Sequence, residues 1–441
     1  MAEYPFKPLE CWAKLKEVRR KLFWDYWKTK ERGEARVLGG YGSFTALPIG
    51  IGARGAAFGI YYARIMRDRD LLLGCHQTMD SRGYGSEICS TLRVNLGSMF
   101  MGFHSKSPSG EYYKPDFILE FHLCDSQCKA AQVAWEYYQI PYHTVEIPLT
   151  FQEREERKEE YVVQQLEEAI RWMEKVTGRK YDDEKLLEAV PREWESRILW
   201  SRICLLNQAV PAPLDQKMLN SFQTLYMWGP HLPEVVEVMR LLYAETQERV
   251  RAGIAAFPLE RARLFHEGQI PWFYPAFLRF PNRYGASFIG GTYTACLQGS
   301  FLSRPDGSWE VPQTLEERGI RLRGREDALR SLADLYLNYS AYNKSFLIEP
   351  QVKSLAKAVE AWHVDGVMFH IDRGCKGQSS SNTQARLELQ RRGVPSMVYE
   401  ANNADPREFS ETQVLDQMEA FLESLGLTRL QTAVPVQEPE D

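Results

Sequence analysis

A lone cysteine follows a mostly apolar run in the stretch FHIDRGCKGQSSSNTQ, residues 369–384. The run predicts a strand that ends before Asp372, and the polar residues after Cys375 predict a helix. A thiol at such a junction can serve as a nucleophile, a metal ligand or a buried bystander. A nucleophile needs a base, and His363 and His370 are near in sequence, but His370 falls inside the predicted strand. The stretch alone leaves the three roles open.

A second pair of thiols, Cys124 and Cys128, stands in the motif CDSQC. A radical-type iron–sulfur motif would need a third cysteine at position 131, which is Ala131, and a zinc site would need a second close pair of ligands. At helical spacing, one of the two thiols can instead be a small buried apolar side chain. The pair alone is therefore a weak indication of a metal site.

A third segment, YGSEICSTLR at residues 84–93, places Cys89 after a glycine-containing loop and at the predicted start of a helix. Taken alone, such a cysteine is more often structural than functional. The start of the chain, MAEYPFKPLE, lacks the apolar core of a signal peptide. We therefore expect free thiols or metal ligands rather than disulfides among the eight cysteines. The other cysteines are Cys11, Cys75, Cys204 and Cys296.

Nucleotide binding finds little support in the motifs. GIGARG, residues 50–55, formally matches G-x-G-x-x-G, but Pro48 stands just before it, and Asp68 and Asp70 precede the next apolar run instead of ending it. A glycine-rich turn with close backbone packing is the favoured interpretation. The chain has no G-x-x-x-x-G-K-[ST] motif. If ATP drives the chemistry, we expect the nucleotide on a partner subunit.

Alternating short apolar runs and helical stretches must position these thiols. In residues 35–150 the apolar runs lie at 71–73, 117–123 and 143–147, and a helical stretch covers 127–139. Such alternation is typical of an α/β fold with a parallel sheet, and we expect a first α/β lobe here.

A second α/β lobe is expected at residues 261–430. Its candidate strands are 287–289, 366–371 and 396–399, and its candidate helices are 327–337, 378–392 and 411–425. The fold class predicted is therefore α/β, with two Rossmann-like lobes that contain parallel sheets.

Helices are expected outside the two lobes. Residues 1–34 form an N-terminal helical segment, with a helix at 9–32, and residues 151–260 form a helical insertion. In the insertion an amphipathic helix stops at Gly178, Asp182 or Asp183 caps the next helix, and Pro191 interrupts that helix. The tail, residues 431–441, is expected to be disordered.

Two cysteine segments share one layout. FILEFHLCDSQCKAAQ, residues 117–132, and VMFHIDRGCKGQSSSN, residues 367–382, each contain a strand, a polar break with a cysteine, and a helix. Ligands of open α/β sheets collect beyond the carboxyl ends of the strands. A helix N-terminus also stabilises a thiolate or an anionic cluster. We therefore expect Cys124 and Cys375 at ligand-binding edges.

Composition limits the classes of partner. The 441 residues are 44% hydrophobic and 26% charged, as in ordinary globular proteins, and the net charge of −5 argues against nucleic acid. No apolar run approaches about 18 residues, so we expect no membrane span and a cytoplasmic protein.

The three dispersed cysteine segments SEICSTLR, LCDSQCK and HIDRGCKGQSSSN resemble those of the 2-hydroxyacyl-CoA dehydratase and benzoyl-CoA reductase family, over roughly residues 10–430. The resemblance implies that Cys89, Cys124 and Cys375 bind a 4Fe–4S cluster, with Cys128 as a spare or substitute ligand. Three protein ligands would leave one iron open for a substrate oxygen.

Three further stretches look closest to the B-type subunit of ATP-dependent benzoyl-CoA reductase: NNADPREFSE at 402–411, TGRKYDDEKLLEAV at 177–190 and LNQAVPAPLDQKMLNS at 206–221. The serine run at 379–381 is a segment where no match can be judged. The resemblance implies an oxidoreductase of anaerobic aromatic degradation that reduces the ring of benzoyl-CoA to a cyclic diene. The implied partners are a paralogous cluster-bearing subunit and ATP-hydrolysing electron-donor subunits.

Two alternatives remain within this resemblance: a subunit of a 2-hydroxyacyl-CoA dehydratase, which eliminates water through a radical, and a non-catalytic electron-transfer subunit. The aromatic-rich residues 268–288 line a pocket or form ordinary core, and Arg279 and Arg283 bind CoA phosphates or are solvated at the surface. Glu87 is a candidate neighbour of the cluster. No proton donor can be chosen among the candidate histidines, which are His76, His104, His122 and His370.

Overall fold

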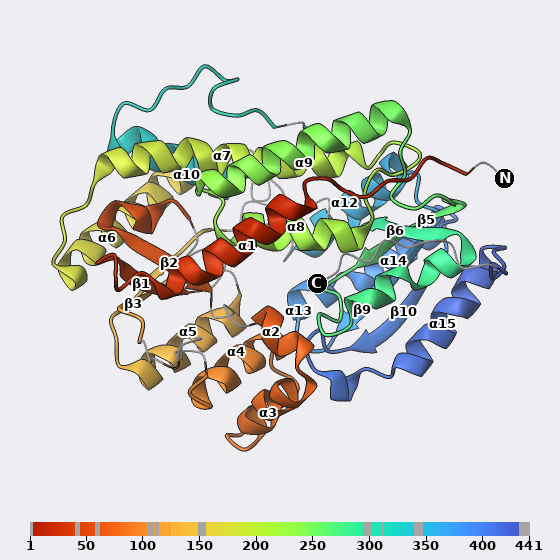
Figure 1. Cartoon of the computed structure of the whole chain (residues 1–441), viewed down its shortest axis with the longest axis horizontal. Coiled ribbons are helices and arrows are strands. Elements are labelled where there is room, and N and C mark those ends of the chain that lie inside the picture. Colours follow the sequence, from red (N-terminus) through yellow and green to blue (C-terminus); the bar gives the residue numbers. More distant parts are fainter. Residues whose placement is uncertain are drawn as a thin grey trace.

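The computed structural model describes residues 3–39, 45–57, 62–103, 110, 114–122, 124–148, 156–293, 301–304, 306–310, 312–338 and 347–431. Two four-stranded parallel sheets form the centres of two α/β lobes, which lie at opposite ends of the long axis (Figure 1). The predicted α/β fold class is confirmed. Among the described residues, no helix is long and apolar enough to cross a membrane.

The first sheet has the order β2-β1-β3-β4. Its strands are β1 Ala35–Gly39, β2 Ala53–Ala57, β3 Phe117–Phe121 and β4 Tyr142–Val145. The first strand thus has the second strand on one side and the third and fourth on the other. Ligands of such doubly wound sheets bind where the order reverses, between the carboxyl ends of the first and third strands.

The second sheet repeats this topology with the order β10-β9-β5-β6. Its strands are β5 Ala262–Glu267, β6 Ala286–Gly290, β9 Gly366–Asp372 and β10 Ser396–Ala401. Here the order reverses between β5 and β9. A small antiparallel pair, β7 Leu302–Ser303 and β8 Trp309–Glu310, lies outside both sheets.

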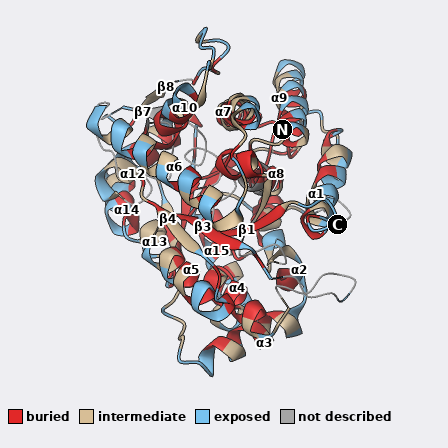
Figure 2. Ribbon diagram, turned by 90° about the vertical axis from the view of Figure 1, so that its left-hand side faces the viewer, coloured by how far each residue is buried: buried red, intermediate tan, exposed pale blue. Residues whose placement is uncertain are grey.

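Each sheet is covered on both faces, as parallel sheets require. In the first lobe, Phe117, Leu119 and Phe121 face α6 Glu156–Thr177, α7 Asp183–Leu206 and α10 Arg325–Asn338. The alternate residue Ile118 faces α4 Ser90–Phe100 and α5 Asp125–Tyr138. Figure 2 shows β1 and β3 in the buried interior, with exposed residues on the outer faces of helices such as α6.

The second lobe is covered in the same way. Phe265, Val367 and Phe369 pack against α1 Trp12–Trp27, α8 Gln216–Trp228, α9 Pro233–Ala252, α12 Ile348–Ala361 and α14 Asn382–Arg391. Leu264 and Met368 face the 3-10 helix η3 Pro275–Tyr284 and α15 Glu411–Ser424. The lobes therefore each bury an apolar core on both sides of their sheet.

Helix α7 joins the two lobes. Its first half, with Trp194, packs in the first-lobe core, and its second half, with Trp200, packs in the second-lobe core. Figure 1 shows α7 running beside α9 along one side of the molecule. The expected interruption at Pro191 is wrong, since α7 continues through this residue. Packing against two cores outweighs the loss of one helical hydrogen bond at proline.

The prediction that 71–73 resembles the strand-like runs of the first lobe is wrong. These leucines lie in α3 Arg69–Asp80, which follows the short helix α2 Tyr62–Arg67. Leu72 is buried and Leu71 packs at the edge of the same core, as on an amphipathic helix. Strands β1, β2 and β5 were not expected, because ARVLG, ARGAA and ARLFHE carry charged residues or glycine within short runs.

The GIGARG motif precedes a strand instead of following one, so the dinucleotide fingerprint is excluded. A 3-10 helix, η2 Leu47–Ile51, ends at Gly52, whose φ is 66°, and β2 follows. A Cβ on Gly50 would lie 2.3 Å from the ring of Tyr181. The interpretation as a glycine-rich turn with close packing is confirmed.

Other local predictions are confirmed. Asp182 caps α7 by accepting hydrogen bonds from the N–H groups of Glu184 and Lys185, and Gly178, with a φ of 66°, ends α6. The predicted helix at 378–392 is two helices, α13 Lys376–Ser379 and α14. Beyond β10, the short helix η5 Pro406–Glu408 precedes α15. His104, Cys296 and residues 432–441 of the expected disordered tail lie outside the described residues.

Candidate metal centre

All three candidate ligands are N-cap residues: Cys89 caps α4, Cys124 caps α5 and Cys375 caps α13. The predicted helix starts are confirmed at each position. Cys124 follows β3 and Cys375 follows β9, which are the third strands of their sheets. Both thiols therefore lie at the edges where the strand order reverses, and Cys89 comes from the loop between α3 and α4.

The structure brings the three thiols together although 286 residues separate the first from the last in the sequence. Burial raises the pKa of Cys89 well above its ordinary value, and the nearby thiols Cys375 and Cys124 raise it further. The backbones also touch: a Cβ on Gly374 would lie 2.9 Å from Cα of Cys89. The segments that carry Cys89 and Cys375 are thus in direct contact across the two lobes.

Each sulfur faces a backbone N–H group three residues further on, and this contact lowers its pKa. The N–H groups are those of Leu92, Gln127 and Gln378. The contacts are weaker than a full capping hydrogen bond, which none of the three side chains makes. The N-terminal turns nevertheless direct partial positive charge at the sulfurs, as suits bound thiolates.

The surroundings of Cys375 are more acidic than basic. Burial raises the pKa of Cys375 to about 12, and the carboxylate of Asp372 adds to the rise. The side-chain amide of Gln269 donates to its sulfur over 3.5 Å. Burial likewise raises the pKa of Cys124. As free groups these thiols are protonated at neutral pH, and a bound metal would supply the positive charge that deprotonates them.

The donor set fits a cluster better than a single ion. In the described part of the chain, no three side chains of histidine, cysteine, aspartate or glutamate meet closely enough to hold one metal ion. Ligands of a cube of four irons bind different irons and stand further apart. All seven described cysteines are free thiols, and Cys89, Cys124 and Cys375 are half-buried. The three residues therefore fit the cluster that the resemblance implies, and its binding stays a prediction.

Cys128 stands one turn after Cys124 on α5. Burial raises the pKa of Cys128 to about 12, followed by the charges of Glu120 and the nearby Cys124. The side-chain amide of Gln127 donates to the carboxylate of Glu120, so this carboxylate is held inside the lobe. Cys128 is thus a neighbour of the candidate centre whose sulfur lacks a helix N-terminus of its own.

Sequence reasoning missed the polar residues that hold the two lobes together beside these thiols. Asp372 ends β9, and Asn402 and Asn403 follow β10; all three are buried. They connect the segment of Cys375 with the first turn of α4. The only signal in the sequence was the motif NNADPREFSE, whose resemblance did not indicate a role for either asparagine.

Two of the candidate proton donors are buried structural side chains. His76 bonds through Nε2 to the carbonyl oxygen of Ala404 over 2.8 Å, and His370 bonds through Nδ1 to the carbonyl oxygen of Gln269 over 2.5 Å. Burial lowers the pKa of both imidazoles. His122 is half-buried two residues before Cys124, and its Nδ1 lies 2.6 Å from Glu146.

A buried carboxyl group adds a candidate. Glu267 ends β5, opposite the end of β9 at the switch point, and burial raises its pKa to about 7. The N–H of Thr292 donates to Glu267 over 2.8 Å, and the hydroxyl of Thr292 donates as well. A carboxyl group with a pKa near 7 can give or take a proton at neutral pH. No motif in the sequence indicated this residue.

The aromatic-rich residues 268–288 form core in large part. Phe277, Tyr284 and Phe288 are buried in the second lobe. Arg279 is bound to Asp215 at 2.9 Å, so its expected place at the surface is wrong. Arg283 lies over the ring of Phe280. The exposed Glu87 folds back over Gly85, where a Cβ would meet its carboxylate.

Comparison with known proteins identifies matching sequences. The family model described as 2-hydroxyglutaryl-CoA dehydratase, D-component, matches residues 56–425. The alpha subunit of (R)-phenyllactyl-CoA dehydratase from Clostridium sporogenes is 24% identical over 342 residues, 76% of each chain. The alpha subunit of (R)-2-hydroxyglutaryl-CoA dehydratase from Acidaminococcus fermentans is 25% identical and covers 70% of this chain and 60% of its own. The B-type subunit of benzoyl-CoA reductase from Thauera aromatica is 24% identical over 79% of both chains.

Proposed function

Because this chain belongs to the 2-hydroxyglutaryl-CoA dehydratase D-component family, we propose that it is an iron–sulfur subunit of an enzyme that acts on acyl-CoA thioesters. Cys89, Cys124 and Cys375 hold a 4Fe–4S cluster in this proposal. One observation carries it: three thiols that cap three helices, drawn from both lobes, meet at one place.

The chain's own residues would bind and shield the cluster. The N-terminal turns of α4, α5 and α13 direct N–H groups at the sulfurs, and Gln269 donates to the sulfur of Cys375. Such donors stabilise thiolate charge and tune the reduction potential. With three protein ligands, a bound cluster would offer one iron as a Lewis acid for a substrate oxygen.

The reaction proposed first is reduction of the thioester-activated ring of benzoyl-CoA or a related aryl-CoA to a cyclic diene. It would use single low-potential electrons from a partner that hydrolyses ATP. The relative from benzoyl-CoA reductase and the stretch NNADPREFSE support this choice. A paralogous cluster-bearing subunit would complete the enzyme, which we place in the cytoplasm.

Elimination of water from a 2-hydroxyacyl-CoA is the second candidate. The relatives named (R)-phenyllactyl-CoA, lactoyl-CoA, (R)-2-hydroxyisocaproyl-CoA and (R)-2-hydroxyglutaryl-CoA dehydratase support it, at 23 to 25% identity. The relative from benzoyl-CoA reductase is 24% identical, so sequence identity does not separate the two reactions. Turnover separates them: the complex is given benzoyl-CoA or a 2-hydroxyacyl-CoA with a low-potential reductant, and the diene or the enoyl thioester is measured.

The cluster is tested by iron and acid-labile sulfide analysis of the chain purified without oxygen. About four irons per chain are expected, with losses in Cys89→Ala, Cys124→Ala and Cys375→Ala. Cys128→Ala is the matched control, because it removes a neighbouring thiol and should keep the iron. Wild-type chain without iron, or iron that survives all three substitutions, would refute the assignment.

A further inference from the structure

We propose that Asn403 is a positioning residue that sets the spacing between Cys89 and Cys375. Its side-chain amide is fully buried between the two segments that carry these thiols and bonds to both. The same amide thus contacts both the first turn of α4 and the end of β9. The assignment of a ligand role to the thiols rests on the proposed function, whereas the spacing itself does not.

The first half of this bridge reaches the helix that Cys89 caps. The hydroxyl groups of Ser90 and Thr91, the two residues after Cys89, donate to Oδ1 of Asn403 over 3.0 and 2.8 Å. The hydroxyl oxygen of Ser90 in turn accepts from the N–H of Ala404 over 3.0 Å. The first turn of α4 is thereby tied to the loop after β10 by three hydrogen bonds.

The second half reaches the segment of Cys375. Nδ2 of Asn403 donates to Oδ2 of Asp372 over 2.5 Å, and Oδ1 of Asp372 accepts from the N–H of Gly374 over 3.1 Å. Asp372 is 1% exposed, so its bonds to Asn403 and Gly374 replace water that the carboxylate has lost. This carboxylate therefore transmits the position of Asn403 to the residue next to Cys375.

The bridge requires a group that accepts on one side and donates on the other. Two hydroxyl donors fix the oxygen of the Asn403 amide toward α4, and the carboxylate of Asp372 fixes the nitrogen toward β9. An aspartate at position 403 would keep the acceptors but place a second carboxylate against Asp372. Two buried carboxylates in contact repel each other, so this change acts on the β9 side alone.

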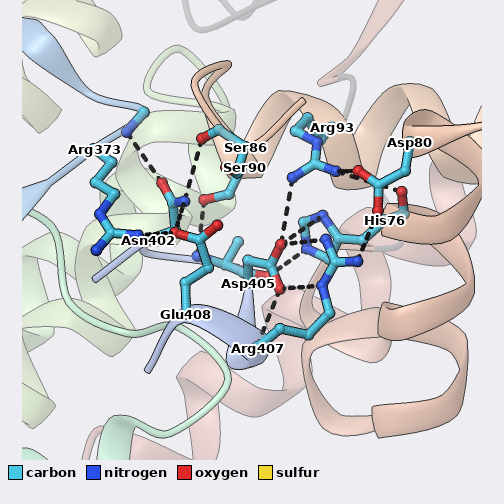
Figure 3. A network of polar contacts seen from close by, with 12 residues as sticks. His76, Asp80, Ser86, Ser90, Arg93, Arg373, Asn402, Asp405, Arg407 and Glu408 are labelled. Atoms are coloured by element: carbon cyan, nitrogen blue, oxygen red, sulfur yellow. Dashed lines mark hydrogen bonds and ion pairs between the residues drawn. The ribbon is translucent and has the colours of Figure 1, made fainter. Parts of the chain in front are cut away.

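The neighbouring Asn402 holds the same loop from the other side. Its Oδ1 accepts from the N–H of Gly374 over 3.0 Å, and its Nδ2 lies 3.3 Å from the carbonyl oxygen of Ser86 (Figure 3). Because a Cβ on Gly374 would lie 2.9 Å from Cα of Cys89, the chain there has no room to slide. From that contact and the spacing of consecutive Cα atoms, Cα of Cys89 and Cα of Cys375 lie within about 8 Å.

A second set of contacts joins the lobes further from the thiols. Arg407 donates to Asp80 over 2.7 Å, and the buried Asp405 lies between Arg93 and His76, as Figure 3 shows. Arg407 and Asp80 are partly exposed. These contacts hold α3 against the loop after β10 but do not touch Asp372 or the first turn of α4. They provide the control for a general loosening of the lobes.

The experiment measures the spacing in the full chain after iron is removed with a chelator and a reductant under argon. Dibromobimane, which bridges two nearby thiols, is added, and mass spectrometry gives the yield of the peptide pair joined through Cys89 and Cys375. We expect Asn403→Asp to lower this yield at least fivefold. The reciprocal double variant Asp372→Asn with Asn403→Asp restores one donor and one carboxylate, so its yield should return to within twofold of wild type.

Two further variants separate position from folding. Arg407→Ala should lower the melting temperature while the cross-linking yield stays within twofold of wild type. Thr91→Val together with Ser90→Ala removes the hydroxyl donors from the α4 side and should lower the yield without any new charge. A yield in Asn403→Asp equal to wild type, or a folded double variant with no recovery, would overturn the proposal.

Iron analysis of the same variants separates this proposal from the proposed function. If wild type holds about four irons and Asn403→Asp keeps both its iron and its cross-linking yield, the positioning role fails and the cluster stands. If wild type holds no iron but the yield still depends on Asn403, the cluster fails and the positioning role stands. If both stand, Asn403→Asp should lose iron and the double variant should recover it.

Discussion

Replacement of Glu267 by glutamine should change how the stability of this protein depends on pH. Glu267 is 5% exposed at the end of β5, and its partners are the N–H and hydroxyl of Thr292. Burial raises its pKa from an ordinary value of 4.5 to about 7, and the bonds from Thr292 offset only part of this effect. The folded chain therefore prefers the protonated carboxyl group.

The sign and size follow from this shift. A carboxyl group whose pKa is raised on folding contributes its full stability below pH 4.5 and loses it as the pH rises through about 7. One pKa unit corresponds to about 1.4 kcal/mol, so the loss reaches about 3 kcal/mol in total. Glutamine resembles the protonated form and can accept the same N–H bond, but it does not ionise.

Urea unfolding of wild type and Glu267→Gln at several pH values between 4.5 and 8 measures the effect. The stability of the variant relative to wild type should rise by about 3 kcal/mol across this range. Glu349→Gln is the matched control: the pKa of Glu349 is lowered by a hydrogen bond from Lys353 at the surface. Its difference from wild type should be small and flat above pH 5. A flat difference for Glu267→Gln would refute the burial argument.

Three other perturbations test the contacts that position the candidate centre. Gly374→Ala should destabilise by about 1 to 3 kcal/mol and lower the iron content, because its Cβ would lie 2.9 Å from Cα of Cys89 and from the carbonyl oxygen of Ile88; unchanged unfolding and iron would contradict this. Asp405→Asn leaves Arg93 with less negative charge in a buried site and should cost about 3 kcal/mol in urea unfolding, whereas a loss below about 1 kcal/mol would show that the ion pair is dispensable. Asp182→Ala removes the cap of α7 and should cost about 1 kcal/mol with no change in iron content, and a loss of iron would show that this cap affects the centre.

The elements next to Cys124 and Cys375 could be predicted because their signals are local. β3 and β9 are apolar runs of five and seven residues, and each is followed by a polar break and a helix. β1 and β5 gave no such signal, since Arg36, Arg263 and His266 interrupt their apolar residues. These polar side chains are buried and bonded to groups far away in sequence, such as the bond from Arg263 to the carbonyl oxygen of Trp362.

The contacts around the candidate centre could not be predicted for a related reason. Asn403 and Ser90 are 313 residues apart, and Gln269 and Cys375 are 106 residues apart. No pattern of periodicity reports a contact at such a separation. The raised pKa of Glu267 likewise depends on burial by segments outside β5. Motif and periodicity therefore identified the thiols, and only the folded chain showed the residues that hold them.

The three thiols differ in how the fold places them. Cys124 and Cys375 each follow the third strand of a sheet with the same strand order, so the topology alone puts both at a switch point. Cys89 has no such strand before it and begins a helix that packs on the outer face of the first sheet. Its position relative to Cys375 therefore depends on contacts between the lobes, which are made by Asn402, Asn403 and the close approach at Gly374. Mutations that loosen the lobes should displace Cys89 before they affect the other two thiols.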